Sequence, residues 1–272
     1  GLDQESLDSE LSHQLLELSR AQGVASYLML LFLFKKQDQL ELKDETLALL
    51  VKLLVCFFVR RNLTDTPPTR DLERLFISIC ESLESEGLKG IAAAEYIKKR
   101  LVDVSASDAS FKERLEGPIY DVNPDMTRYI LTVIASPSVT KEMKPLWDRY
   151  DSGNYVWTIE HIFPQGKNIP DEWVKMVADG DVSRAIEVQE KQVHTLGNLT
   201  ITGYNSKLSN MPFVTKRDRK DANGANVGYR NGLNLNDELV NTDTWTSEQI
   251  QERTDKLVGL TLKAFDFDEI EF

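Results

Sequence analysis

The sequence contains only two cysteines and three histidines among its 272 residues. Cys56 and Cys80 lie in apolar, helix-like surroundings without the spacing of metal ligands, so we interpret them as reduced core residues. The apolar run Val24–Phe34 has about half the length of a membrane span. A secretory signal and a Gly-rich loop for nucleotide phosphates are also lacking. We therefore expect a cytoplasmic protein with no membrane partner.

Positive charge is scarce as well, since 32 basic side chains face 44 acidic ones and the net charge is −12. This balance is unfavourable for binding nucleic acid, because phosphates are contacted mainly by Lys and Arg. Residues 161–230 are the exception, with ten basic and eight acidic side chains. The basic residues near the end of this segment are Lys207, Lys216, Arg217, Arg219, Lys220 and Arg230. They predict a local basic patch, although a solvated helix face explains each one equally well.

Residues 1–150 have a helical pattern, with apolar side chains at helix spacing and breaks at Pro67-Pro68 and Gly87. The expected helices are Val24–Phe34, Glu45–Val59, Arg70–Glu86, Ile91–Leu101, Ala109–Leu115, Pro124–Ala135 and a segment near Thr140–Arg149. Helices joined by short connections favour an irregular bundle, which we interpret as a connector domain over residues 1–150. Arg60 and Arg61 could face DNA, but a role at a helix end is the better interpretation.

The turn residues 151–154 mark the expected boundary of a second domain over residues 151–272. Its expected elements are the strands Tyr155–Ile162 and Gly197–Thr202 around an insert with helical pieces, a short helix after Tyr204, a basic helix through Lys220 and a last helix capped by Thr246. The predicted fold class is therefore mainly α with a small α+β part: a helical bundle followed by a core of two strands and a helix.

Two of the three histidines, His161 and His194, fall in this second domain, and Glu160 directly precedes His161. Hydrolysis of a phosphodiester needs an activated water, and an imidazole that titrates near neutral pH is its natural base. Glu160 and Asn205 offer hard oxygen ligands that suit one Mg²⁺ or Mn²⁺ ion. Neighbouring side chains of a strand point to opposite faces, so Glu160 and His161 converge only if the strand ends or twists there.

With the strand–strand–helix order, this set predicts a ββα-metal nuclease core with His161 as base, Glu160 and Asn205 as metal ligands, and Asn198 binding backbone groups across the loop. Each residue alone also has a plain structural interpretation, as a salt-bridge partner or a helix cap. For His194 two roles stay open: contact with phosphate or a ligand, and a structural hydrogen bond.

Four ordered motifs resemble the HNH-type nuclease domain that ends GmrSD-class restriction enzymes. They are Glu160–Pro164, His194–Ile201, Asn205–Asn210 and the pair Phe213 and Lys216. Two flanking segments, Phe58–Leu63 and Trp245–Arg253, agree with the resemblance, which thus covers most of the chain.

The resemblance implies a bacterial anti-phage protein that cuts or nicks modified DNA. It also implies an N-terminal NTP-hydrolysing sensor domain as partner, and the start at Gly1 rather than Met fits a fragment without that domain. It assigns His161 as base, Glu160 and Asn205 as metal ligands and Asn198 as organiser. Asn205 stands where the broader HNH pattern often has His, which favours Mg²⁺ or Mn²⁺ over Zn²⁺.

Two other functions compete with a DNA endonuclease. The acidic charge and the large helical part favour a non-catalytic DNA-docking or assembly module of the same defence system. Activity on RNA is a weaker alternative, which the sequence does not exclude.

Overall fold

The computed structural model describes residues 10–272, apart from the side chains of Ser206 and Lys207. It is mainly helical, with one two-stranded antiparallel sheet, as the sequence predicted. The chain forms two compact units: one runs up to Phe111 and takes in Leu262–Phe272, and the other is Lys112–Thr261. Among the described helices, none combines the length and apolar character needed to cross a bilayer.

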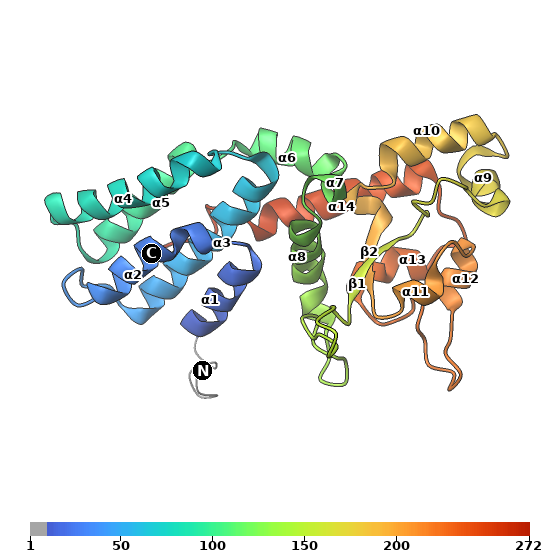
Figure 1. Cartoon of the computed structure of the whole chain (residues 1–272), viewed down its shortest axis with the longest axis horizontal. Coiled ribbons are helices and arrows are strands. Elements are labelled where there is room, and N and C mark those ends of the chain that lie inside the picture. Colours follow the sequence, from blue (N-terminus) through green and yellow to red (C-terminus); the bar gives the residue numbers. More distant parts are fainter. Residues whose placement is uncertain (1–9) are drawn as a thin grey trace. The chain divides into compact units, whose positions relative to one another are not determined.

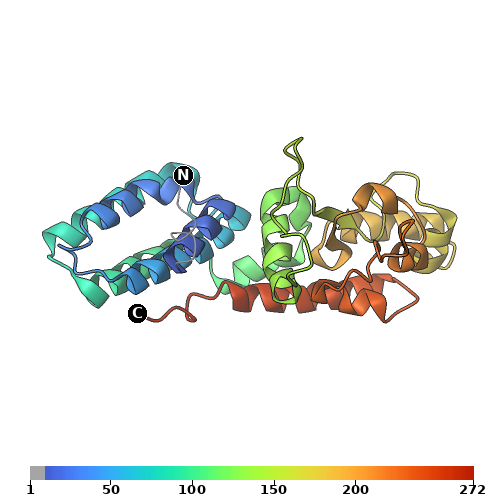
Figure 2. The same cartoon turned by 90° about the horizontal axis from the view of Figure 1, so that it is seen from below.

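The first unit is built around one long apolar helix. Its elements are α1 (Glu10–Arg20), η2 (Val24–Ser26), α2 (Tyr27–Lys35), α3 (Asp44–Thr64), α4 (Thr69–Ser85) and α5 (Gly90–Val104). Most of α3 is buried between α1 and α5, and α2 packs on α4 (Figures 1 and 2). The predicted helices of this part are confirmed, and the apolar residues of α3 and α4 are buried against neighbouring helices, whereas Leu28 and Leu31 of α2 stay exposed.

The two arginines near the end of α3 bind protein groups. Arg60 is buried, pairs with Asp108 and lies over the Phe111 ring at 4.9 Å from its centroid. Arg61 donates to the Pro67 carbonyl at 3.1 Å and to Asp65 at 2.8 Å, just beyond the helix end. The interpretation as a helix-end residue is therefore confirmed for Arg61. Both arginine side chains are engaged by groups of the protein itself.

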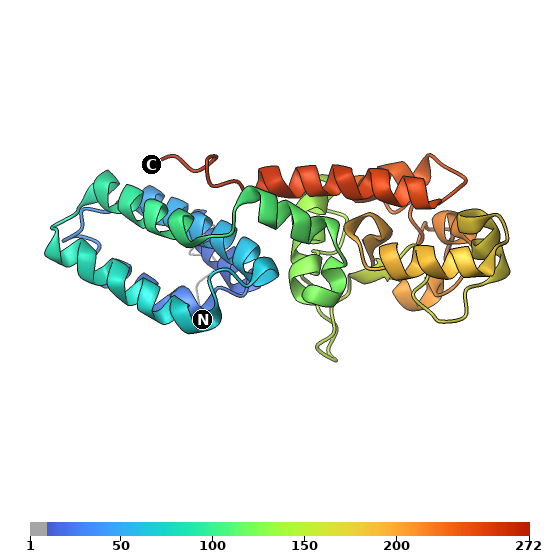
Figure 3. The same cartoon turned by 90° about the horizontal axis from the view of Figure 1, so that it is seen from above.

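The second unit holds the sheet and shorter helices around it. Its elements are α6 (Asp108–Glu116, shared with the first unit), α7 (Ile119–Val122), α8 (Pro124–Ala135), η3 (Ser136–Ser138), β1 (Thr158–His161), α9 (Asp171–Ala178), α10 (Val182–Gln192), η4 (Leu196–Asn198), β2 (Leu199–Thr202), α11 (Asn205–Leu208), α12 (Phe213–Asp218), η5 (Asn234–Asn236), α13 (Asp237–Val240) and α14 (Ser247–Ala264). Figure 3 shows α14 as one unbroken helix. Strand, insert, strand and short helix follow in the predicted order, with shorter strands than expected.

The helix expected near Thr140–Arg149 is wrong. This segment is irregular and runs into a tight turn, where Val156 N donates to the Asp148 carbonyl and Tyr150 N to that of Asn154, both at 2.9 Å. Pro145 explains part of the difference, because a proline disfavours the helical conformation in the residue before it. The rest follows from the turn residues 151–154, which fold the chain back on itself.

The compact units also divide the chain earlier than the predicted boundary at 150/151. The reason is Arg128 on α8, whose guanidinium donates to the Leu146 carbonyl at 2.6 Å and to the Trp157 carbonyl at 3.1 Å. α8 also packs against β2. These contacts tie α8 to the sheet, although it precedes the turn. Whether residues 151–272 form a domain of their own stays a prediction.

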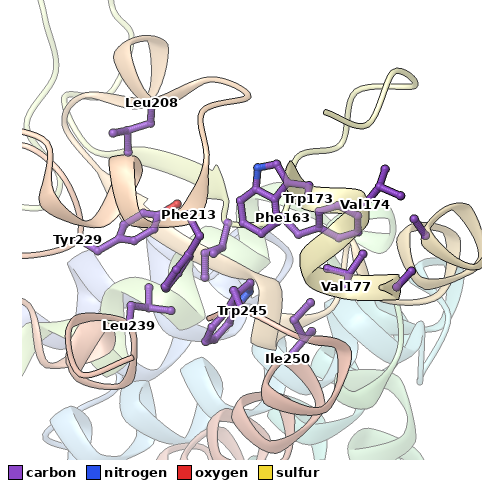
Figure 4. Packing of buried hydrophobic residues seen from close by; sticks show 13 residues of the cluster. Phe163, Trp173, Val174, Val177, Leu208, Phe213, Tyr229, Leu239, Trp245 and Ile250 are labelled. Carbon is purple, nitrogen blue, oxygen red and sulfur yellow. The ribbon is translucent and has the colours of Figure 1, made fainter. Parts of the chain in front are cut away.

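A hydrophobic core fixes the sheet to the helices of the second unit. Trp173, Phe213 and Trp245 are buried at its centre, and the rings of Phe213 and Trp245 stack at 5.7 Å between centroids (Figure 4). Ile162 and Phe163, which follow β1 directly, belong to the same cluster. The end of β1 is therefore anchored on the core, which makes it a rigid support for the polar residues there.

Candidate active site

The end of β1 carries two polar side chains with different partners. In the antiparallel register Glu160 lies opposite Thr200, and His161 opposite Leu199. Because side chains alternate along a strand, Glu160 and His161 face opposite sides of the sheet. Accordingly, Glu160 Oε1 accepts a hydrogen bond from Lys216 Nζ at 2.6 Å, whereas His161 Nε2 lies 3.0 Å from His194 Nδ1. The structure does not bring the Glu160 carboxylate and the His161 imidazole together.

Lys216 fills the space under the end of β1. Its side chain is fully buried, and its ammonium also donates to the carbonyls of His161 and Ile162 at 2.9 and 3.0 Å. The Tyr229 hydroxyl lies 3.5 Å from the same Glu160 oxygen. Burial raises the pKa of Glu160 and lowers that of Lys216, while the attraction between the two charges acts against both shifts. This buried ion pair ties α12 to the strand end.

His161 lies in an aromatic and imidazole environment on the other face. Tyr120 of α7 meets the His161 ring edge to face at 4.8 Å and stacks on the His194 ring at 5.4 Å. The Tyr120 N–H also donates to the His194 carbonyl at 3.2 Å. Burial, with a smaller effect of His194 and Lys216, lowers the pKa of His161 to about 3. His161 is therefore neutral at physiological pH, as a general base must be.

Asn198 binds the backbone groups that the sequence assigned to it. Its Nδ2 donates to the carbonyls of Phe163 and Val193 at 2.9 and 3.0 Å, and its Oδ1 accepts from Phe163 N at 2.8 Å. The Trp245 indole donates to the same oxygen at 3.3 Å. Because Asn198 is completely buried, these bonds hold the two strand ends in register. A catalytic role for Asn198 stays a prediction.

Gly197 is where α14 meets the loop before β2. A Cβ atom there would lie 2.0 Å from the Ile250 carbonyl and 2.3 Å from Thr254 Oγ1. Arg253 adds to this contact by donating to the Gly197 carbonyl at 2.6 Å. The absence of a side chain at Gly197 therefore allows α14 to support the site.

We expect Gly197→Ala to lower the free energy of unfolding by about 3 kcal/mol, because helix backbone must move to admit the methyl group. Urea denaturation measures this. The control is Gly259→Ala on the same helix, where a Cβ meets nothing within 4 Å and the substitution should stabilise the fold by up to about 1 kcal/mol. Equal effects of the two substitutions would contradict the predicted close approach.

Asn205, the second predicted metal ligand, begins α11 and reaches back to the sheet. Its Nδ2 donates to the Ile159 carbonyl at 2.6 Å, which fixes the amide beside β1. No contact joins its Oδ1 to the Glu160 carboxylate in the described part of the chain. Residues 10–272, as described, contain no cluster of three His, Cys, Asp or Glu side chains suited to a metal ion.

The predicted basic patch does not hold for two of its members. Lys216 is buried against Glu160, and Arg217 is buried between Asp218 and Asp243, with contacts of 2.6 and 2.5 Å. Both side chains serve the fold because their charges are satisfied inside it. Arg219 is half-buried, Lys220 is exposed, and the side chain of Lys207 lies outside the described residues. Nucleic-acid contacts of Lys207, Arg219 and Lys220 stay predictions.

Sequence reasoning missed Tyr120 and Asp121, which contact the two histidines. Asp121 Oδ1 lies 3.6 Å from His194 Nε2. No motif marks either residue: they sit in a short helix after Gly117-Pro118, far from the nuclease-like motifs in the sequence. Only the fold of the second unit brings α7 to the sheet.

Comparison with known proteins identifies the second unit. A search of curated proteins gives no match. The family model described as "GmrSD restriction endonucleases, C-terminal domain" matches residues 105–260, which is more than half of the chain and includes Glu160, His161, Asn198 and Asn205. The chain therefore belongs to the GmrSD restriction endonuclease family, as its C-terminal domain, a nuclease module of restriction systems that acts on DNA.

Proposed function

We propose that this chain is a metal-dependent HNH-type DNA endonuclease that cuts or nicks phage DNA by attack of a water molecule on a phosphodiester. The observation that carries the proposal is the buried His161 at the end of β1, paired with His194 and inside the segment that matches the endonuclease family. A general base needs an unprotonated nitrogen held in a fixed place, and His161 offers one.

His161 is the general base, and its Nδ1 is the atom that accepts the proton. The reason is that Nε2 faces His194 at 3.0 Å. Asn198 keeps the strand ends in place, and the Tyr120 ring covers His161 and His194. The role of His194 is thus a hydrogen bond to the base.

Glu160 and Asn205 would hold one Mg²⁺ or Mn²⁺ ion. Their carboxylate and amide oxygens are hard donors of the type these ions prefer. Lys216 engages Glu160 Oε1, so the other carboxylate oxygen is the one offered to a cation. When bound, the ion supplies neutralisation of charge on the phosphate and on the leaving oxygen.

The wider setting follows from the family. We infer a bacterial cytoplasmic anti-phage system in which an N-terminal NTP-hydrolysing domain senses the modification of the DNA. Arg219, Lys220 and Lys207 are the cations proposed to contact the phosphate backbone. The non-catalytic docking module is less well supported, because a docking role gives no reason for a buried neutral imidazole among aromatic side chains.

The test is nicking of supercoiled plasmid by the chain with Mg²⁺ or Mn²⁺, and with EDTA in a parallel reaction. We expect nicking only with the metal, and little cleavage of a matched RNA. Asn205→Ala should raise the Mn²⁺ concentration for half-maximal nicking by about tenfold or more. Asn223→Ala, at an exposed position outside the nuclease motifs, is the control.

Three outcomes would count against the proposal. DNA binding without any cleavage would favour the docking module. Nicking that resists EDTA would exclude the metal-dependent mechanism. Preferential cleavage of RNA would change the substrate.

A further inference from the structure

A line of three polar side chains leads from the strand end to α7. His161 Nε2 lies 3.0 Å from His194 Nδ1, and His194 Nε2 lies 3.6 Å from Asp121 Oδ1. Building on the proposed function, we propose that Asp121 and His194 are positioning residues that hold His161 in the tautomer with an unprotonated Nδ1. Asp121 carries no role in the motifs that define the nuclease site.

The order of protons along the line follows from the chemistry of the groups. The negative charge of the Asp121 carboxylate lies 3.6 Å from His194 Nε2, so it favours the tautomer of a neutral His194 that carries its proton on Nε2. His194 Nδ1 then has a lone pair, and the contact at 3.0 Å requires His161 Nε2 to donate. A neutral His161 has no second N–H, so its Nδ1 carries the lone pair that takes a proton from water.

Tyr120 fixes the orientation of both rings. It stacks on His194 with 14° between the ring planes and meets His161 at 82°, so both imidazole ring planes are packed against the same aromatic side chain. Its backbone N–H holds the His194 carbonyl at 3.2 Å. Two neighbouring residues of α7 thus act on the histidines: Tyr120 packs against both rings, and Asp121 favours the proton of His194 on Nε2.

The size of the effect is limited by solvent. The Asp121 side chain is 59% exposed and that of His194 is 22% exposed, so water weakens the attraction between them. We therefore expect the loss of Asp121 to lower kcat by about tenfold, at the lower end of what removal of a supporting outer contact costs. Substrate KM should stay unchanged, because Asp121 does not contact DNA in this proposal.

The direct test is ¹⁵N NMR of the histidine rings of the full chain near neutral pH, without metal or DNA. We expect His161 and His194 to carry their protons on Nε2, with a scalar coupling across the His161 Nε2–H···Nδ1 His194 bond. In Asp121→Asn this preference should weaken and the Nδ1–H form of His161 should increase. Asp148→Asn, which removes the same charge at another exposed position, should leave both spectra unchanged.

The kinetic test compares two substitutions of His194. The Asn side chain offers an oxygen near the position of Nδ1 and can accept from His161, whereas Leu cannot. His194→Asn should therefore retain more nicking than His194→Leu, at equal thermal stability. Equal losses in the two variants would contradict a hydrogen-bonding role.

The NMR result separates this inference from the proposed function. A wild-type His161 with its proton on Nδ1, or a tautomer that Asp121→Asn leaves unchanged, would overturn the proposed positioning by Asp121 and His194 even if the chain nicks DNA. If both histidines carry their protons on Nε2 but the chain has no nuclease activity, the positioning by Asp121 and His194 is supported as a structural feature and the proposed function is refuted instead.

Discussion

His161→Ala is expected to lower the rate of metal-dependent plasmid nicking by about 10²- to 10⁴-fold, the usual contribution of a general base. The imidazole at the end of β1 is the neutral, buried acceptor of the site, and burial holds its pKa near 3, far below its ordinary value. The rate of conversion of supercoiled to open-circular DNA at saturating Mg²⁺ measures the effect.

His13→Ala is the matched control, because His13 is exposed and lies in α1 of the first unit. It should nick as the wild type does. Both variants should stay folded at the assay temperature, which thermal melting checks, so that a loss of rate is not a loss of fold. Equal rates for His161→Ala and wild type would rule out His161 as the base, whatever the metal requirement.

Lys216→Met is expected to lower the free energy of unfolding by about 3–5 kcal/mol, the range for removing one partner of a buried ion pair. It leaves the Glu160 carboxylate buried without its cation and takes a donor from the carbonyls of His161 and Ile162. Urea denaturation of the variant and the wild type measures the loss.

A second variant identifies the cause. Combining Glu160→Gln with Lys216→Met removes both charges. The double variant should therefore have a higher free energy of unfolding than Lys216→Met alone. Lys220→Met, at an exposed lysine two residues beyond α12, should change stability by no more than about 0.5 kcal/mol. If Lys216→Met instead leaves stability intact and only weakens DNA binding in a salt-dependent way, Lys216 contacts DNA as part of the predicted basic patch, and its role as a buried counter-ion is contradicted.

Local patterns predicted most of the elements. The apolar spacing of α3, α4 and α8, the Thr66–Pro68 break and the turn at 151–154 each act over a few residues, so they can be read directly from the sequence. The segment 140–149 was predicted wrongly because its conformation also depends on hydrogen bonds with residues outside it, which a local pattern does not show. Those contacts come from Arg128 on α8 and from Val156 after the turn.

By itself the sequence determined the ordered motifs, the presence of two strands around an insert and the backbone role of Asn198, since each depends on residues close along the chain or on a resemblance of the whole segment. Only the tertiary structure decided what surrounds the two sides of β1. Alternation along the strand sends Glu160 to Lys216 and His161 to His194 and Tyr120, and these partners come from α12, α7 and the loop before η4. Charge and hydrogen bonding act through space, so a lysine that appears in the sequence as part of a basic patch becomes a buried counter-ion, and an unmarked aspartate comes to face a histidine of the site.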